Sequence, residues 1–530
     1  MSALAGTGSL VRLALRRDRV ILPIWIVIFA GMAWSSAGAT TDLYPTAASR
    51  AAAVMSMNAA PALVALYGYV YSASIGALSL IKMTSTGAAA LAVLAFMLVI
   101  RHTRAEEEAG RLELIGATAI GRSAAMTAAV VVSAGTCILI GVLSTIGLMS
   151  SGLPTEGSIA FGLAWAATGC AFAAVGALAA QLTSGGRSAI GISSIFLGLA
   201  YFVRAIGDTT GHDNASWLSW LSPIGWEMQV RPFAHERWPA LLLLVAFAVV
   251  TGSSAYVLAH RRDLGAGLLA DRPGPAVGSR RLSGAAGLAW RLHRGTVISW
   301  AAAIVMVGAI IGSIASQIGG MLDSPAAKEF ITKLGGSHVL TDAYLALELG
   351  AMGAIVSIFG MQAVMRMRQE EVAWRTDIAL ATATSRSKWL ASHVVMAVAG
   401  TAGLILIGGL ASGMGDALQV GDAGQFGRIL GGAAVQIPAA LVMTGIVVAT
   451  FGLWPRLTTA TWGLLVAFML LGQFGTIFNL PSWVMDLSPF AHTPRIPGSE
   501  LQWAPLVAMS AIAIALIGVG FVAFRRRDIG

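Results

Sequence analysis

A charged segment with a fixed order of residue types occurs twice in this sequence. Residues 104–111 read Arg-Ala-Glu-Glu-Glu-Ala-Gly-Arg, and residues 368–375 read Arg-Gln-Glu-Glu-Val-Ala-Trp-Arg. The twenty positions that start at Arg104 and at Arg368 share ten identities. Such a match between distant parts of one chain indicates an internal duplication. Carboxylates beside guanidinium groups favour ion pairing, so the first question is what these charges hold together.

Strong helix formers fill both copies, which predicts a short helix in each. Glu107 and Arg111 are four residues apart, as are Glu371 and Arg375, so each pair is expected to meet on one helical face. The charges can simply retain a loop on one side of a membrane and cap helix ends. Acidic residues contribute little to orientation, however, and they recur here in register. We therefore expect a docking role, carried by Glu106, Glu107, Gly110, Arg111, Arg122, Glu370, Glu371, Arg375 and Arg386.

Residues for enzyme chemistry are sparse. The eight histidines are scattered, and Cys137 and Cys170 both lie within apolar stretches, so we expect no catalytic centre, metal site or redox cofactor. No phosphate-binding loop of the form G-x-x-x-x-G-K-[ST] occurs, since none of the four lysines follows a glycine. If ATP drives a process here, the ATPase must be a separate polypeptide.

The composition predicts that membrane helices position these segments. Of the 530 residues, 56% are hydrophobic and 11% are charged, whereas a soluble domain carries about a quarter charged residues. The net charge of +9 would suit nucleic acid, but the basic residues lie at the ends of apolar stretches, which predicts a membrane partner and no nucleic acid. The sequence therefore predicts an all-α polytopic membrane protein.

Twelve apolar stretches approach the roughly 20 residues that cross a bilayer. Their centres lie near Phe29, Leu94, Ile138, Phe172, Phe196, Ala248, Val307, Ile355, Leu404, Met443, Ala467 and Ile514. Placing the N-terminus in the cytoplasm puts 25 of the 34 lysines and arginines on that side. The positive-inside rule then predicts a multi-pass protein of the cell membrane with both termini in the cytoplasm.

The duplication extends beyond the charged segment. Ser216-Trp217 returns as Ser482-Trp483, and Arg261-Arg262-Asp263 as Arg526-Arg527-Asp528. An even number of spans makes the two copies parallel. We expect a first six-helix half over residues 1–265, a Pro/Gly linker over 266–285, and a second six-helix half over 286–530.

Several motifs resemble one known family. The segment from Arg101 to Arg111, the Leu-Ser-Pro motifs at 221–223 and 487–489, and the terminal Arg-Arg-Arg-Asp-Ile at 525–529 are similar to ABC-2-type permeases described as exporters of polyketide antibiotics, the tetronasin type of actinobacteria. The resemblance covers nearly the whole chain. Trp374 replaces the glycine found at position 110, so we expect the docking shape of the second copy to differ.

This resemblance implies a transport subunit without its own catalytic site. A separate ABC ATPase, in two copies per chain, would dock on the charged segments as coupling helices, with ATP and Mg bound to that partner. The chain would export lipophilic drugs or polyketide antibiotics. The amphipathic stretches 9–19 and 286–294 would either touch the ATPase or lie on the membrane surface.

The resemblance also places the substrate pathway between the halves, along the second, fifth, eighth and eleventh spans. The aromatic and thioether residues of these spans suit varied lipophilic guests, although ordinary helix packing is the competing explanation for each of them. The candidates are Phe96, Met97, Phe196, Tyr201, Phe202, Met352, Phe359, Met361, Trp462, Phe468, Met469 and Phe474.

Charged residues near span ends have two interpretations. Lys82, Arg204 and Glu348 either lie at membrane depth or, as we expect, snorkel to the interface. The segments 208–238 and 479–503 are rich in tryptophan and proline and predict short interfacial helices at the outer gate.

The main alternative is a proton-coupled drug transporter of the major facilitator type, which also has twelve spans in two parallel halves. It would need protonatable groups in its core, and few are present.

Overall fold

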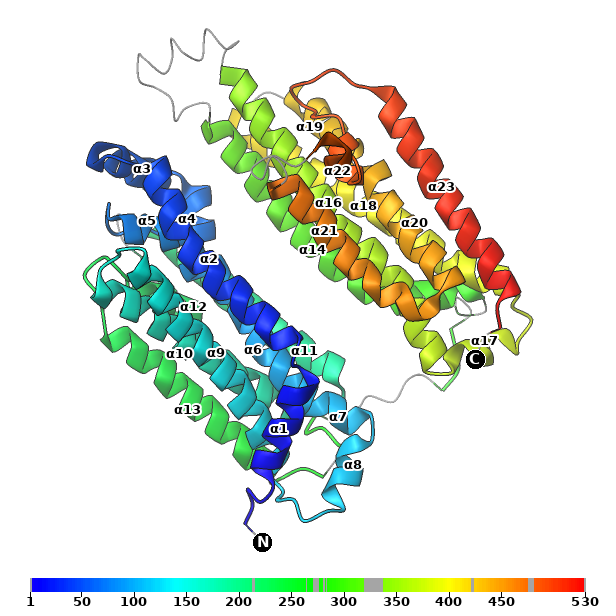
Figure 1. Ribbon diagram of the computed structural model, residues 1–530, viewed down its shortest axis with the longest axis horizontal. Helices are drawn as coiled ribbons and strands as arrows, with labels where there is room; N and C mark the ends of the chain where they lie inside the picture. Colours follow the sequence, from blue (N-terminus) through cyan, green and yellow to red (C-terminus); the bar gives the residue numbers. More distant parts are fainter. Residues whose placement is uncertain are drawn as a thin grey trace. The chain divides into compact units, whose positions relative to one another are not determined.

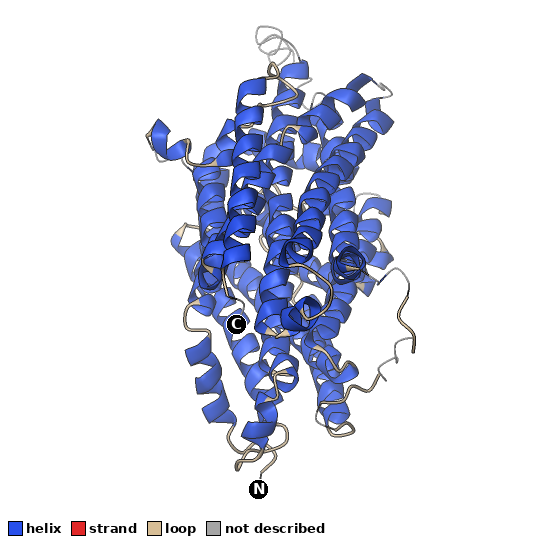
Figure 2. Ribbon diagram, turned by 90° about the vertical axis from the view of Figure 1, so that its right-hand side faces the viewer, coloured by secondary structure: helices blue, strands red, loops and turns tan. Residues whose placement is uncertain are grey.

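A computed structural model describes residues 2–211, 215–263, 265–269, 276–279, 282, 284–318, 337–420, 424–474 and 481–528. Within these ranges the chain is helical and contains no strand (Figure 2). The contacts divide it into two compact units, Met1–Gly274 and Pro275–Gly530. Part of the predicted linker, namely residues 270–275, 280, 281 and 283, lies outside the described residues.

The first unit contains six helices long and apolar enough to cross a membrane. Connecting helices lie at both ends of these spans, and all are drawn in Figure 1. In chain order the unit comprises α1 (Thr7–Arg17), α2 (Ile21–Leu43), α3 (Ala47–Ala59), α4 (Pro61–Tyr67), α5 (Ile75–Lys82), η1 (Met83–Gly87), α6 (Ala88–His102), α7 (Arg104–Glu108), α8 (Arg111–Gly116), α9 (Ala124–Ser150), α10 (Thr155–Leu182), α11 (Gly186–Thr210), η2 (Trp217–Leu221), α12 (Pro223–Gln229) and α13 (Pro239–Ala259).

The second unit contains five such helices among its described residues, which makes eleven in all. It comprises α14 (Ala285–Ile318), α16 (Ser337–Val372), α17 (Arg375–Leu380), α18 (Arg386–Val420), α19 (Gly424–Ala434), α20 (Ile437–Leu453), η5 (Pro455–Ala460), α21 (Thr461–Phe474), α22 (Ser482–Met485), η6 (Pro489–His492) and α23 (Trp503–Arg526). The eleventh predicted span, near Ala467, corresponds to α21, which has 14 residues and is followed by residues 475–480 outside the described part.

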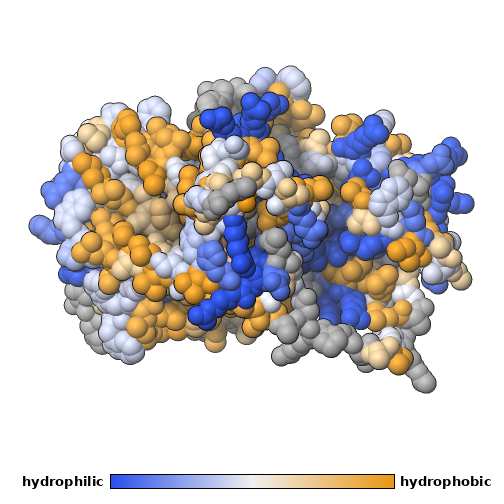
Figure 3. Space-filling model, turned by 90° about the horizontal axis from the view of Figure 1, so that it is seen from below, coloured by the Kyte–Doolittle hydropathy of each residue, from blue (hydrophilic) through white to orange (hydrophobic). Residues whose placement is uncertain are grey.

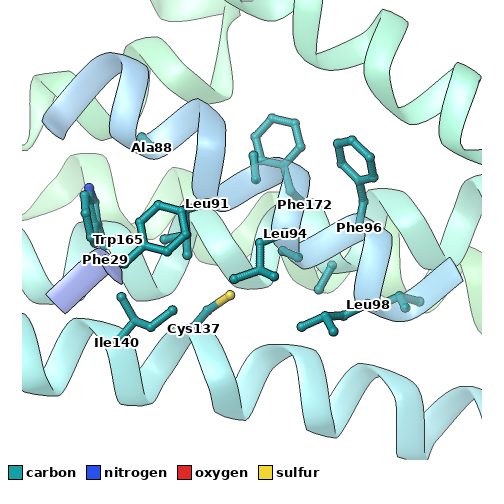
Figure 4. Close-up of a cluster of buried hydrophobic side chains, with 14 of the residues drawn as sticks. Phe29, Ala88, Leu91, Leu94, Phe96, Leu98, Cys137, Ile140, Trp165 and Phe172 are labelled. Atoms are coloured by element: carbon teal, nitrogen blue, oxygen red, sulfur yellow. The ribbon is translucent and has the colours of Figure 1, made fainter. Parts of the chain in front are cut away.

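Helix α10 forms the centre of the first unit because its small residues let neighbouring backbones approach closely. A Cβ added at Gly162 would lie 2.5 Å from the carbonyl oxygen of Gly141 in α9, and one at Gly176 would lie 2.8 Å from the backbone of Phe96. Trp165 and Phe172 of α10 pack with Phe29 and Phe96 in the buried cluster of Figure 4. Tight helix contacts therefore hold the first unit together.

The two units differ in how the chain enters its first membrane span. Helix α1 ends at Arg17, and α2 begins afresh at Ile21 with Pro23 in its first turn. Proline is tolerated in a first turn but clashes inside a helix, so Pro23 requires the break. The second unit has no proline in this region, and the amphipathic stretch 286–294 continues without a break into α14.

Candidate functional site

The first charged segment forms a helix, a sharp break and a second short helix. Helix α7 ends at Glu108, Gly110 adopts a left-handed φ of +67°, and α8 begins at Arg111. No heavy atom lies within 4 Å of a Cβ built at Gly110, so the backbone conformation rather than crowding favours glycine. The predicted short helix of the first copy is present as α7, whereas residues 368–372 of the second copy continue the long helix α16.

Glu106 holds the two sides of this break together. Arg111 donates to both of its carboxylate oxygens, at 2.7 and 3.0 Å, and Arg17 of α1 donates to one of them at 2.5 Å. Glu106 itself is only 8% exposed. This carboxylate therefore ties α1, α7 and α8 into one structure.

Glu107 connects the segment to the rest of the unit. It accepts two bonds from Arg262, at 3.0 and 2.7 Å, and a short one from Arg104. Arg104 is fully buried and also donates to the carbonyl oxygens of Ala180 and Ala266, at 3.1 and 2.7 Å. The segment is thereby fixed to the end of α10 and to the chain that follows α13.

The second charged segment repeats this network at matching positions. Arg375 donates to both oxygens of Glu370 at 2.7 and 3.2 Å, and Arg366 pairs with the same carboxylate at 3.0 Å. Glu371 pairs with Arg368 at 3.2 Å and with Arg527 at 2.8 Å. Each pair of glutamates thus binds the following arginine through its first member and the arginine after the last span through its second. The second partner of Glu370 is Arg366 of its own helix, whereas that of Glu106 is Arg17 of α1.

The prediction that Glu107 pairs with Arg111 and Glu371 with Arg375 is wrong. In both units the arginine pairs instead with the first of the two glutamates, five residues before it. An i to i+4 contact requires an unbroken helix, but the chain reverses its helical sense at Gly110. The arginine side chain therefore folds back across the break.

Trp374 does not change the backbone of the second break. It adopts φ +58°, in the left-handed region, as Gly110 does at +67°. That conformation is costly for a residue with a Cβ, yet the surrounding ion pairs maintain it. The shapes differ through the tryptophan side chain, which is 66% exposed, and not through the backbone.

Arg122 and Arg386 are also equivalent. Arg122 donates to the carbonyl oxygens of His260 and Arg262, at 3.3 and 3.0 Å, and Arg386 donates to those of Arg525 and Arg527, at 3.3 and 2.8 Å. Each arginine therefore binds the backbone at the end of the last span of its unit to the start of the third span. Sequence reasoning placed Arg122 and Arg386 but missed the role of Arg262 and Arg527, although the repeated Arg-Arg-Asp motif marked them.

The carboxylates are buried, so other residues form the exposed surface of the turns. Leu114 in α8 is 75% exposed, and Ile378, 264 positions later in α17, is 71% exposed. Viewed from the end at which the N-terminus lies, hydrophobic patches alternate with hydrophilic clusters (Figure 3). Both turns therefore expose an apolar side chain at this shared position on a scaffold of ion pairs, and the second turn also exposes Trp374.

A pocket of about 560 Å³ lies beside the first turn. Leu10, Arg12, Leu13 and Arg16 of α1 line one part of it, and Leu114 lines another. Its apolar floor and basic rim suit a partner segment that is apolar and acidic.

Two arginines of the turns keep their charge at all physiological pH values. The bond to Glu106 raises the pKa of Arg111, and the bond to Glu370 raises the pKa of Arg375.

The two units differ next to the turns. Asp18, fully buried, pairs with Arg101 at 2.9 Å and with His102 at 2.6 Å. In the second unit His293 and His393 share a hydrogen bond of 3.0 Å. Among the described residues no group of three His, Cys, Asp or Glu side chains could hold a metal ion.

The candidate pathway residues fall into three classes. Five are buried in the core of their own unit, namely Phe96, Met352, Phe359, Met361 and Phe468. Four are partly buried and pack against those cores, namely Phe196, Tyr201, Trp462 and Met469. Met97 and Phe202 are 46% and 59% exposed, and the side chain of Phe474 lies outside the described part. Helix packing, the competing explanation, accounts for the buried members, while the pathway role stays a prediction.

Arg204 is buried within the first unit. Its side chain is fully buried in α11, where it donates to Asp208 at 3.3 Å and to the carbonyl oxygen of Leu66 at 3.2 Å. A local carboxylate and a helix end satisfy the charge, so it need not reach the interface. Lys82 is exposed, with its ammonium 5.7 Å from the ring of Tyr67, and Glu348 is half-buried.

Comparison with known proteins places the chain in a family. The family model described as "Multidrug efflux system permease Rv1217c, C-terminal domain" matches residues 282–525. The whole chain is 43% identical to the multidrug efflux system permease protein Rv1217c of Mycobacterium tuberculosis, over 533 aligned positions that cover 96% of that protein. This similarity includes both charged turns and extends over every helix described above. The chain therefore belongs to the family of multidrug efflux system permeases.

Proposed function

We propose that this chain is the membrane subunit of an ATP-driven exporter and that a separate ATPase docks on its two charged turns. One observation carries the proposal: two turns with the same ion-pair scaffold each present an exposed apolar residue at the same register, Leu114 and Ile378. Two exposed apolar side chains, held by equivalent scaffolds, could each bind one of two copies of a soluble partner. ATP and Mg would bind that partner.

The orientation follows from charge. The segments on the same side as the turns and both termini together carry 25 of the 34 lysines and arginines, and we place that side in the cytoplasm of a cell-membrane protein. The buried glutamates have a positioning role in this proposal. They hold α8 and α17 in place, while the exposed side chains make the contact.

The substrates that we propose are lipophilic compounds, with polyketide antibiotics among them. The M. tuberculosis relative is described as a permease of a multidrug efflux system, which supports a broad apolar specificity. A pathway lined by aromatic and thioether groups would bind by shape adaptation rather than by a fixed set of hydrogen bonds.

The test uses exposed residues, because replacing the buried glutamates would also disturb folding. The chain is purified with its ATPase from cells that express both, as wild type and as the double variant Leu114→Asp, Ile378→Asp. Met55→Asp is the matched control, since Met55 is 74% exposed and lies in α3 at the other end of the unit (Figure 1).

We expect the double variant to lose the ATPase and the drug-stimulated ATP hydrolysis, while the control keeps both. An intact and drug-responsive complex in the double variant would refute the docking surface. Drug efflux that requires only a proton gradient would refute the ATP-driven exporter and favour the proton-coupled alternative.

A further inference from the structure

Helices α3 and α5 lie at the end of the first unit away from the charged turns (Figure 1). Asn58 of α3 and the residues that precede α5 line a polar pocket. It has a volume of about 450 Å³. The side chains that matter for its chemistry are Asn58, Tyr69, Tyr71, Arg231, His235 and Arg237. None of the described residues that line it carries a carboxylate, so its lining is basic.

The loop that supplies the basic residues has an unusual backbone. Arg231, Phe233 and His235 adopt left-handed φ values of 53°, 63° and 57°. Left-handed conformations at residues other than glycine cost energy and persist only where the surroundings impose them. Three in one loop of five residues indicate that this loop is held in a defined shape.

Phe233 shows what imposes this shape. Its ring fills a slot that exists because Gly76 of α5 and Gly157 of α10 have no side chains. Its carbonyl oxygen accepts a bond of 3.0 Å from Ser74, and its backbone N–H donates to Glu236 at 2.9 Å. With Phe233 fixed in the core, its neighbours Arg231 and His235 are fixed at the pocket.

Tyr71 and Gln229 orient the side chain of Arg231 further. Its guanidinium lies 3.6 Å from the centre of the Tyr71 ring, and its Nε donates to Gln229 at 3.1 Å. Gln229 in turn donates to the Tyr71 hydroxyl at 3.1 Å. A planar guanidinium held in one orientation is well suited to oxyanions.

The pocket adjoins the first residues of two candidate membrane spans. The second span begins at Ile75, four residues after Tyr71, and the sixth begins at Pro239, two residues after Arg237. Trp238, between Arg237 and that span, is 38% exposed, as expected for a residue at the interface. Phosphate groups of lipids are found at this depth.

We propose that this pocket binds a phosphate group. Arg231 and Arg237 would pair with the phosphate oxygens, and Tyr69 and Tyr71 would line one side of the pocket. The phosphate belongs either to a phospholipid headgroup or to a soluble phosphorylated ligand. The site is independent of the ATPase and therefore adds to the proposed export function.

The experiment measures phosphate-dependent binding to the purified full-length chain. Wild type, Arg231→Gln/Arg237→Gln, and Arg237→Gln alone are reconstituted in nanodiscs of phosphatidylcholine with or without phosphatidylglycerol. Native mass spectrometry then counts the phosphatidylglycerol molecules retained. Arg495→Gln is the matched control, because Arg495 is an exposed arginine that follows the second Leu-Ser-Pro motif. Size-exclusion profiles check that each variant is folded.

We expect wild type and Arg495→Gln to retain phosphatidylglycerol equally, and the double variant to bind it about tenfold or more weakly, with Arg237→Gln between them. Arg237 is exposed, so its single variant reports on binding even if the double variant folds poorly. Equal retention by wild type and Arg237→Gln would overturn a lipid source.

A second arm titrates inorganic phosphate and follows thermal stability in phosphatidylcholine alone. A rise in the midpoint for wild type that is absent in Arg237→Gln identifies a soluble phosphate source. If neither phosphatidylglycerol nor inorganic phosphate distinguishes wild type from Arg237→Gln, the proposal is refuted.

Discussion

Replacing Glu107 by alanine should destabilise the first unit strongly. The change leaves Arg104, which is fully buried, and Arg262, whose side chain is 8% exposed, without their carboxylate. Removing one partner of a buried ion pair costs about 3 to 5 kcal/mol, because the remaining charge stays out of water. The carbonyl oxygens around Arg104 remain and reduce this cost without cancelling it.

The second unit provides the comparison. Glu371→Ala removes the partner of Arg368, whose side chain is 31% exposed, and of Arg527, at 13%. Water can solvate Arg368 in place of the lost carboxylate, so we expect a smaller loss, about 1 to 3 kcal/mol. The exposed Glu113 of α8 is the control, and Glu113→Ala should change little.

The assay heats the purified protein and measures the fraction that remains monodisperse by size-exclusion chromatography. The apparent Tm should fall most for Glu107→Ala, less for Glu371→Ala and not for Glu113→Ala. Equal Tm values for the Glu107 and Glu113 variants, or a larger loss for Glu371→Ala, would refute the argument from burial.

Two further predictions concern strain and protonation. Trp374→Gly should increase the free energy of unfolding by about 1 kcal/mol, because glycine adopts φ +58° without strain. The apparent Tm should therefore rise. A lower Tm would show that the exposed ring is structurally required. Burial raises the pKa of Glu227 well above its usual value, although the charge of Arg204 opposes the shift. The folded protein therefore favours the protonated acid, and it loses stability as the pH rises above about 4.5. Glu227→Gln should therefore raise the Tm at pH 7.5 and leave it nearly unchanged at pH 4.5, and a uniform shift at both values would contradict this.

The sequence by itself was sufficient to predict the fold class, because long apolar stretches have no stable alternative to membrane helices. It also located the two turns, since ten identities over twenty positions do not require any knowledge of structure. At the expected span near Ala467 the described helix has 14 residues and ends at Phe474, so eleven helices of spanning length are found among the described residues.

Tertiary structure decided how the turns are held. Arg262 lies 155 positions from Glu107 in the chain, so local periodicity could not reveal their ion pair. The left-handed conformation of Trp374 is equally invisible in the sequence, where tryptophan signals no such turn. The contact of Arg204 with the carbonyl oxygen of Leu66, 138 positions away, was equally hidden from the sequence. Residue types and spacing predict helices, whereas the partners of a buried charge depend on which distant segments the packed helices bring together.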